Sequence, residues 1–341
     1  MIRNTFAAFL FVLFSFFTNG FAAAEKDTEL EPAFKENNVA VCLCCDDKFA
    51  LYAGVAIQSI IANSSDKNNY DIVIFGNKIS QKKKDMVSGL IKGFDNFSIR
   101  FIDIDKELAK YKESFFIRLY YSVDIYSRLF IFKIFSSFDR VLYLDSDLVV
   151  NRDVADLFNV DIGDKVVAAC SCWNTINGAL HKRGIGMSKD PSSYFNSGVI
   201  VFDLKKTRGE DIFGKCIAVL NEKSSAIKYP DQDALSVVFD GRTLILDQRW
   251  NFFEDKPFDS PPYIIHFTGK HKPWIDPTLR KTGTFFLKYA EMTPFCDTIE
   301  SETRVDRIIY FVKYFPRRVG RFIKRTYCAI VGDMLQSPSC S

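Results

Sequence analysis

Two aspartates one residue apart, Asp145 and Asp147, follow directly on the apolar run from Val141 to Leu144. In an extended strand, side chains at positions i and i+2 point to the same side, so both carboxylates can face one cation. Carboxylate oxygens are hard ligands that suit Mg²⁺ or Mn²⁺. The same Asp-x-Asp spacing also occurs in solvated turns and helix caps, and it is the preceding apolar strand that favours a metal site here.

A second stretch whose residues could do chemistry runs from His266 to Trp274 and contains two of the three histidines, His266 and His271. His266 follows a short apolar run, and its imidazole is a ligand that Mn²⁺ accepts beside carboxylates. Lys270 and Lys272 can neutralise phosphate oxygens, and Gly269 lets the backbone approach a ligand closely. The stretch predicts a phosphate-binding loop beside a metal ligand, although a histidine such as His266, taken alone, is more often a hydrogen-bonded core residue.

Continuous apolar runs, which are typical of buried parallel strands, mark the elements that must position these residues. We expect strands at 39–44, 71–75, 98–104, 141–144, 165–170 and 197–204, and helices at 53–61 and 81–91. Strands that alternate with helices predict an α/β fold with a mostly parallel sheet. Ligands of such sheets bind beyond the carboxyl ends of the strands, where the acidic residues stand.

Composition narrows the class of protein. Of 341 residues, 48% are apolar and 26% are charged, which excludes a disordered chain and allows a sizeable core. The net charge is only +3, so no nucleic-acid partner is expected for the chain as a whole. Nine cysteines are too few for a disulfide-built scaffold of this length.

The N-terminal residues suggest targeting. Arg3 precedes an apolar run at 6–17, and small residues lead up to Glu25. Residues 1–24 therefore resemble a secretory signal peptide or an uncleaved membrane anchor, followed by a polar linker at 25–38. We expect a membrane-associated protein, and the cytoplasmic membrane face and a secretory lumen both stay open.

The C-terminal stretch differs from the rest of the chain. Between positions 303 and 327 there are eight basic residues and one acidic residue, and apolar residues recur at helical spacing. Pro316 should kink or split such a helix. A basic amphipathic helix predicts contact with a membrane surface for the tail at 293–341, and a helix packed on its own domain is the alternative.

Six short motifs, in this order, resemble glycosyltransferase family 8, the family of glycogenin and of bacterial lipooligosaccharide α-galactosyltransferases. The resemblance covers about 39–292. The motifs are Cys45-Asp46-Asp47, Tyr126-Ser127-Arg128-Leu129, Leu142-Tyr143-Leu144-Asp145-Ser146-Asp147, Phe195-Asn196-Ser197-Gly198-Val199, Asp231-Gln232-Asp233 and His266-Phe267-x-Gly269-x-x-Lys272-Pro273-Trp274.

The resemblance implies a GT-A type nucleotide-sugar-binding fold with a mixed, mostly parallel sheet at 39–292. The basic helical C-terminal tail expected from its own residues follows this domain. It implies a UDP-sugar donor and Mn²⁺, with Mg²⁺ as a substitute, bound by Asp145, Asp147 and His266. Gln232 and Asp231 would be the catalytic residues. The substrate-binding residues that it implies are Cys44, Asp46, Asp47, Phe49, Arg128, Ser146, Asn196, Ser197, Gly269, Lys270 and Lys272.

The implied reaction is the retaining transfer of a hexose, from UDP-glucose or UDP-galactose, to a glycan or glycolipid acceptor such as lipopolysaccharide. Gln232 is a poor nucleophile because a neutral amide oxygen has little basicity, which favours attack from the leaving-group side. A covalent route through Asp231 is the alternative. Cys172 stands where the family's galactosyltransferases have an Asp that contacts sugar. Which sugar is transferred or accepted therefore stays open. A nucleotide-sugar-binding protein without catalysis is the alternative function.

Overall fold

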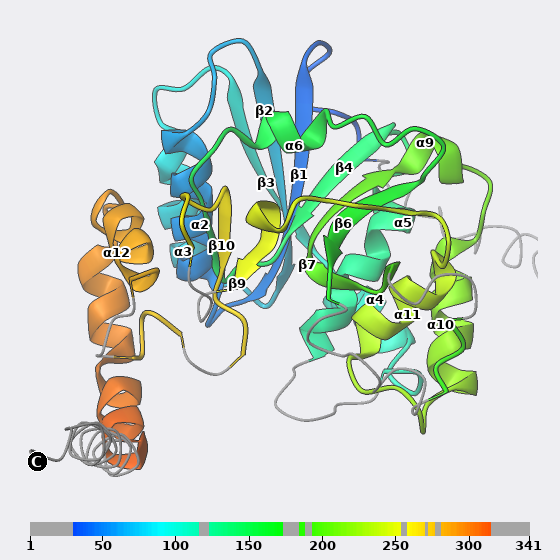
Figure 1. Cartoon of the computed structure of the whole chain (residues 1–341). Helices are drawn as coiled ribbons and strands as arrows, with labels where there is room; N and C mark the ends of the chain where they lie inside the picture. The colour runs from blue at the N-terminus through cyan, green and yellow to red at the C-terminus, as the bar shows by residue number, and fades with distance from the viewer. Residues whose placement is uncertain are drawn as a thin grey trace, which may run out of the picture.

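The computed structural model describes residues 30–115, 123–172, 184–187, 193–253, 258–269, 272–276 and 281–314. Their main feature is a seven-stranded sheet in the order β3-β2-β1-β4-β7-β6-β8 (Figure 1). Its strands are β1 (Asn38–Asp46), β2 (Asn69–Asn77), β3 (Phe97–Asp103), β4 (Arg140–Leu144), β6 (Val167–Ser171), β7 (Phe195–Asp203) and β8 (Thr243–Ile245).

The sheet is mixed. Strands β3, β2, β1 and β4 run parallel to one another, and β7 runs antiparallel to both β4 and β6. The reversal brings the start of β7 beside the end of β4, where the Asp145 amide donates to the Gly198 carbonyl at 2.8 Å. The mixed, mostly parallel α/β fold expected from the sequence is thereby confirmed, and the expected strands lie within about two residues of the observed ones.

A smaller sheet completes the architecture. It consists of β5 (Leu148–Val150), β10 (Ile264–His266) and β9 (Phe252–Phe253), in the order β5-β10-β9. Strand β5 begins directly after Asp147 and pairs antiparallel with β10, with His266 opposite Leu148. Through this pairing, His266 lies close to the end of β4, although the two are far apart in the sequence.

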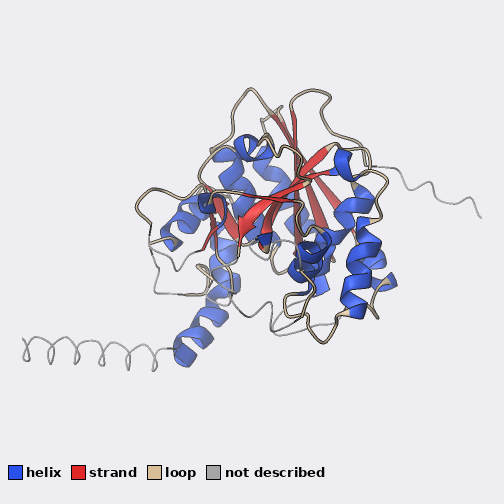
Figure 2. Ribbon diagram, turned by 45° about the vertical axis from the view of Figure 1, so that its right-hand side comes forward, coloured by secondary structure: helices blue, strands red, loops and turns tan. Residues whose placement is uncertain are grey.

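Helices cover both faces of the large sheet (Figures 1 and 2). Alternate residues of β1 enter different cores: Val41 and Leu43 pack with α2, whereas Ala40 and Cys42 pack with η2 and α5. Burial on both faces explains why β1 is a continuous apolar run. The helices are α2 (Ala50–Ala62), α3 (Gln81–Ser88), η1 (Gly89–Ile91), α4 (Asp105–Lys110), η2 (Val123–Phe130), α5 (Ile131–Ile134), α6 (Val154–Phe158), α9 (Leu204–Thr207), α10 (Ile212–Glu222), α11 (Pro230–Val238), η4 (Gln248–Asn251) and α12 (Gly283–Glu291).

A last helix at 296–314 confirms that the C-terminal tail is helical within the part that the structure describes. Ile299, Thr303 and Tyr310 are buried on one side of it. Its other side exposes a set of large apolar side chains: Val305, Ile308, Ile309, Phe311 and Val312. The first half of the tail therefore packs on its own domain. The expected contact with a membrane surface stays a prediction, and Pro316 lies outside the described residues.

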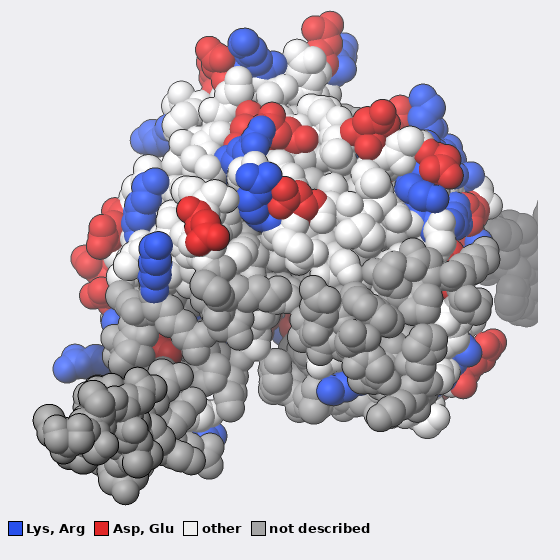
Figure 3. Space-filling model, viewed as in Figure 1, with Lys and Arg blue, Asp and Glu red and all other residues white. Residues whose placement is uncertain are grey.

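The expected membrane localisation is contradicted by the helices. Within the described ranges, none of them combines the length and the apolar character needed to cross a bilayer. The segment on which the signal peptide or anchor is expected, residues 1–24, lies outside the described residues. On the face drawn in Figure 3, basic and acidic side chains are interspersed over the described surface.

Candidate active site

A cavity of about 310 Å³ opens at the carboxyl ends of β1 and β4. Six parts of the chain meet there: the end of β1, the end of β4, η2, the start of β7, the first turn of α11, and β10 with the loop after it. Among the predicted site residues, those that line it are Cys44, Asp46, Phe49, Arg128, Asp145, Ser146, Asp147, Asn196, Ser197, Asp231, Gln232, His266, Gly269 and Lys272.

Three of these residues could hold a metal ion. The ligand atoms of Asp145, Asp147 and His266 all lie within 4.8 Å of one another. His266 Nε2 is 3.1 Å from an Asp147 oxygen and 3.4 Å from an Asp145 oxygen. Two carboxylates with one imidazole are a donor set that suits Mn²⁺ and accepts Mg²⁺ less readily.

Gly198 shapes the back of this cluster. A Cβ at that position would lie 2.2 Å from His266 Cε1 and 2.6 Å from an Asp145 oxygen, both far inside van der Waals contact. The missing side chain thus leaves the space in which His266 and Asp145 converge. The chemistry and the shape of the cluster both fit a divalent cation.

Asn251 fixes the orientation of the His266 ring. The Asn251 amide donates to Asn196 at 2.8 Å, which turns its Oδ1 toward His266 Nδ1, also at 2.8 Å. Nδ1 therefore carries the hydrogen, and Nε2 faces the carboxylates. Burial alone would lower the pKa of His266, but Asp147 and Asp145 outweigh burial and raise that pKa to about 9.

Lys272 reaches the same cluster from the loop after β10. Its ammonium contacts an Asp147 oxygen and donates to the Phe267 carbonyl at 2.6 Å. Burial would raise the pKa of Asp147, but Lys272 and His266 together hold it well below its usual range. Gly269 in this loop has φ +74°, a conformation that favours glycine.

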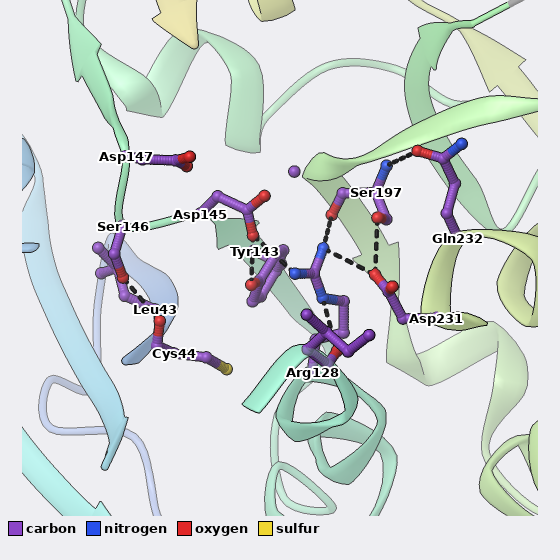
Figure 4. A network of polar contacts seen from close by, with 12 residues as sticks. Leu43, Cys44, Arg128, Tyr143, Asp145, Ser146, Asp147, Ser197, Asp231 and Gln232 are labelled. Atoms are coloured by element: carbon purple, nitrogen blue, oxygen red, sulfur yellow. Dashed lines mark hydrogen bonds and ion pairs between the residues drawn. The ribbon is translucent and has the colours of Figure 1, made fainter. Parts of the chain in front are cut away.

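Arg128 joins the metal side of the cavity to its opposite wall (Figure 4). One terminal nitrogen lies 2.8 Å from Asp145, and the other lies 3.1 Å from Asp231 and donates to the Ser197 carbonyl at 2.6 Å. The Tyr143 ring lies under the guanidinium, with its hydroxyl donating to Asp145 at 2.6 Å. A single buried cation thus pairs with two carboxylates.

Asp231 and Gln232 stand in the first turn of α11, beside the start of β7. The Ser197 hydroxyl donates to Asp231 at 2.7 Å, and Gln232 Oε1 accepts from the Ser197 amide at 3.3 Å and from Asn196 at 3.2 Å. Burial raises the pKa of Asp231, although Arg128 acts against it. The Gln232 carbonyl therefore faces the start of β7.

Two buried residues behind Gln232 fix its amide. Gln232 Nε2 donates to the Tyr194 hydroxyl at 2.7 Å, and that hydroxyl donates to Asp233 at 2.6 Å. Since the hydroxyl proton is directed to Asp233, the hydroxyl oxygen accepts from Gln232 and keeps the amide from flipping. Tyr194 could not be predicted as a site residue, because an aromatic residue just before a strand usually belongs to the core.

The end of the cavity farthest from Gln232 has fewer charged groups and is formed by the carboxyl end of β1 and the turn after it. The Ser146 hydroxyl donates to the Cys44 carbonyl at 2.6 Å, and Asp46 accepts from the Phe49 amide at 2.9 Å. Burial raises the pKa of Asp46. Phe49 packs edge-on against Trp274 with ring centroids 6.0 Å apart.

Two predicted residues fall elsewhere. Asp47 does not face the cavity: its carboxylate accepts from the Ser80 amide at 2.8 Å and pairs with Lys83 at 3.3 Å. The backbone turns after β1, so Asp46 and Asp47 point in different directions. Lys270 lies outside the described residues. Cys172 is buried in a small apolar cluster with Ile185 and Tyr194, away from the cavity lining.

The chain was compared with known proteins. A family model described as glycosyl transferase family 8 matches residues 40–278. A lipopolysaccharide 1,2-glucosyltransferase of Escherichia coli is 29% identical over 209 residues, which cover 56% of this chain and 60% of the relative. Glycosyltransferase GlyF of Streptococcus pneumoniae is 26% identical over 268 residues, which cover 74% of this chain and 61% of GlyF.

Solved structures agree in fold. The bifunctional glycosyltransferase WbbM matches with a TM-score of 0.66 and 27% identity, over 82% of this chain and 53% of WbbM. The galactosyltransferase LgtC, solved with donor and acceptor sugar analogues, matches with a TM-score of 0.66 and 24% identity, over 75% of this chain and 96% of LgtC. With a family model that spans most of the sheet and every described wall of the cavity, the chain belongs to glycosyl transferase family 8.

Proposed function

We propose that this glycosyltransferase moves a hexose from a UDP-sugar to a glycan or glycolipid acceptor, with a divalent cation and with retention of anomeric configuration. The observation that supports this best is the layout of one cavity. A cluster suited to a cation, Asp145 with Asp147 and His266, faces a buried pair of polar residues, Asp231 and Gln232, across Arg128.

The cluster and the lysine beside it provide the chemistry that the leaving group needs. A cation held by Asp145, Asp147 and His266 would act as a Lewis acid for the departing diphosphate. Lys272 already stands at Asp147, within reach of the same space, and can donate to a phosphate oxygen as a point charge. Charge that develops on the diphosphate would thus meet preplaced positive groups.

The opposite wall suits the sugar. Asp231 has its carboxylate engaged by Arg128 and by the Ser197 hydroxyl, which lowers its availability as a nucleophile. Gln232 is neutral and held in place by Tyr194. These contacts favour attack from the leaving-group side, with Gln232 orienting the sugar and Asp231 balancing the positive charge that develops on it.

The transferred sugar is proposed from the relatives. A 1,2-glucosyltransferase and a galactosyltransferase of lipopolysaccharide are both among them, so UDP-glucose and UDP-galactose are the first donors to test. The acceptor is proposed as the sugar of a lipopolysaccharide-type glycolipid for the same reason. Cys172 packs behind Tyr194 and cannot offer a hydroxyl-binding carboxylate there.

The test is a UDP-release assay with each donor, with and without soluble hexose acceptors, in Mn²⁺, in Mg²⁺ and after chelation. We expect acceptor-stimulated release that needs the cation, and a product whose anomeric signal by NMR matches the donor. UDP-sugar binding without any turnover would instead identify a non-catalytic nucleotide-sugar-binding protein. Release that continues after chelation would overturn the metal assignment.

A further inference from the structure

The helix at 296–314, expected from its sequence to face a lipid surface, contacts two segments that contribute Asp46, Phe49 and Lys272 to the cavity lining. One is the turn between β1 and α2, which carries Asp46 and Phe49. The other is the segment at 272–276, which begins with Lys272. We call this part of the cavity the donor end, since the proposed function places the nucleotide-sugar there. We propose that this helix is part of the donor site, and that Arg307 and Tyr310 are positioning residues for nucleotide-sugar binding.

The contacts with the segment at 272–276 are directional hydrogen bonds. Arg307 Nε donates to the Trp274 carbonyl at 2.8 Å. The Tyr310 hydroxyl donates to Asp276 at 2.9 Å, in a buried position. Both bonds fall within four residues of Lys272, whose ammonium reaches Asp147. Holding this short segment therefore sets where the Lys272 side chain enters the cavity.

The contacts with the turn after β1 are ionic. Lys83, with only 11% of its side chain exposed, lies 3.3 Å from Asp47 and 3.1 Å from Glu302 of the helix. Lys48 pairs with Asp306 at 3.4 Å, but both are exposed, so this pair contributes little. The nearly buried Lys83 thus ties the helix to the residue next to Asp46.

Aromatic side chains also connect the segment at 272–276 to the turn between β1 and α2. Trp274 stacks on Tyr52 with ring centroids 3.9 Å apart, and its edge meets Phe49 of the cavity wall. Trp274 is 2% exposed, so a displaced backbone at this position would move Phe49 or open a gap against it. A shift of the helix would therefore be felt on both sides of the donor end.

The helix itself is well anchored. Ile299 and Thr303 are buried on the same side as Arg307 and Tyr310, and Phe295, just before the helix, packs against α2 at Gly54. A Cβ at Gly54 would lie 2.7 Å from the Phe295 ring. The packing makes the helix a fixed support rather than an appended segment, and its exposed apolar side is not needed for this role.

The inference rests on the proposed function, and it is tested with variants of the full chain. Arg307→Met removes the hydrogen-bond donor and keeps an unbranched side chain as far as the ε position, whereas Arg307→Gln keeps an N–H group at the ε position. Tyr310→Phe removes only the hydroxyl. Arg304→Met, on the exposed side of the same helix, is the matched loss of charge.

Two readouts are taken for each variant: hydrogen–deuterium exchange of peptides that cover 264–276, and the donor KM and kcat with UDP affinity in Mn²⁺. We expect Arg307→Met and Tyr310→Phe to speed exchange in that peptide and to raise the donor KM and the UDP Kd roughly tenfold, with kcat much less affected. Arg307→Gln should recover most of the loss, and Arg304→Met should match the wild type.

The two readouts distinguish failure of the proposed helix role from failure of the proposed transferase function. If exchange and UDP affinity in Arg307→Met equal those in Arg304→Met, the helix does not support the site and the inference is wrong. If the variants change exchange as expected but the wild type neither binds UDP nor turns over a UDP-sugar, the proposed function fails while the mechanical link stands. A general loss of melting temperature with unchanged UDP affinity would also overturn the inference.

Discussion

The ion pair between Arg128 and Asp231, with 3.1 Å between nitrogen and oxygen, connects the wall with Asp231 and Gln232 to the cluster of Asp145, Asp147 and His266, because the same guanidinium pairs with Asp145. Replacing Arg128 by Met would leave the buried Asp231 carboxylate without its cation and would remove the cation nearest to Asp145. We expect Arg128→Met to lower the free energy of unfolding by about 3 kcal/mol. It should also weaken both Mn²⁺ and donor binding.

Urea unfolding and calorimetric Mn²⁺ titration measure the two effects of Arg128→Met. Arg152→Met, at an exposed pair with Asp156, is the control and should change neither quantity by much. A variant that lost stability but bound Mn²⁺ normally would show that Arg128 does not influence the metal side.

Asp147→Asn should reduce transfer by at least about 100-fold, because an amide oxygen is a weaker ligand for a hard cation than a carboxylate. The same change removes the anionic partner of Lys272, so a modest fall in melting temperature is expected as well. Steady-state rates at saturating Mn²⁺ measure the first effect. Activity within tenfold of the wild type would refute the ligand assignment.

Gly198→Ala should weaken Mn²⁺ binding without unfolding the chain, since the added methyl would collide with His266 and Asp145. Paramagnetic resonance of free Mn²⁺ in titrations reports the affinity directly. Gly89→Ala is the matched control: Gly89 has φ −62° and no neighbour within 4 Å of an added Cβ. Equal affinities of the two variants would show that the space at Gly198 plays no part in cation binding.

Gln232→Ala should lower kcat by roughly 10- to 100-fold while the affinity for UDP stays close to that of the wild type. The reason is that Gln232 lies at the wall opposite the cation cluster, among Asn196, Ser197 and Tyr194. Pre-steady-state rates and UDP calorimetry separate the two quantities. A large loss of UDP affinity would show instead that Gln232 contributes to binding of the nucleotide.

Glu210 should contribute to the loss of folding stability at acidic pH. Hydrogen bonds from Arg242, and then from Lys215, lower the pKa of Glu210 to about 2. Because the folded pKa is depressed, the contribution is fully present above the ordinary pKa of Glu and is lost as the pH falls toward 2. Urea unfolding of Glu210→Gln should thus differ most from wild type near neutral pH, and a constant difference down to pH 2.5 would contradict the assignment.

Much of the site was predictable because its residues end apolar runs. Asp145 and Asp147 follow the buried strand β4, and His266 is the last residue of the buried strand β10, so the sequence pattern shows where all three lie. Asn251 was missed, since it lies in the short helix η4 and acts only through the His266 ring. The turn of Asp47 toward Ser80 and Lys83 was not predicted either, because a strand pattern does not show how the backbone turns beyond its last residue.

The tail was harder to interpret for a related reason. Its charge and apolar spacing are compatible with lipid or with protein as the partner of one helix side. Only the folded chain shows that Arg307 and Tyr310 meet Trp274 and Asp276. The membrane localisation inferred from the N-terminal composition found no support among the described helices. Composition of a segment does not determine which surface it contacts.

The pairing of β10 with β5 has a consequence for how the protein matures. It joins His266 to Asp147 across 119 positions of sequence, so the proposed metal ligands come together only after nearly the whole domain has been synthesised. Closure of so long a loop is slow and entropically costly, which places assembly of this cluster late in folding. A ribosome-bound chain from which β10 has not yet emerged therefore holds Asp145 and Asp147 but lacks the third proposed ligand, His266. A cation that binds the complete cluster would stabilise only molecules in which β10 has docked, by mass action.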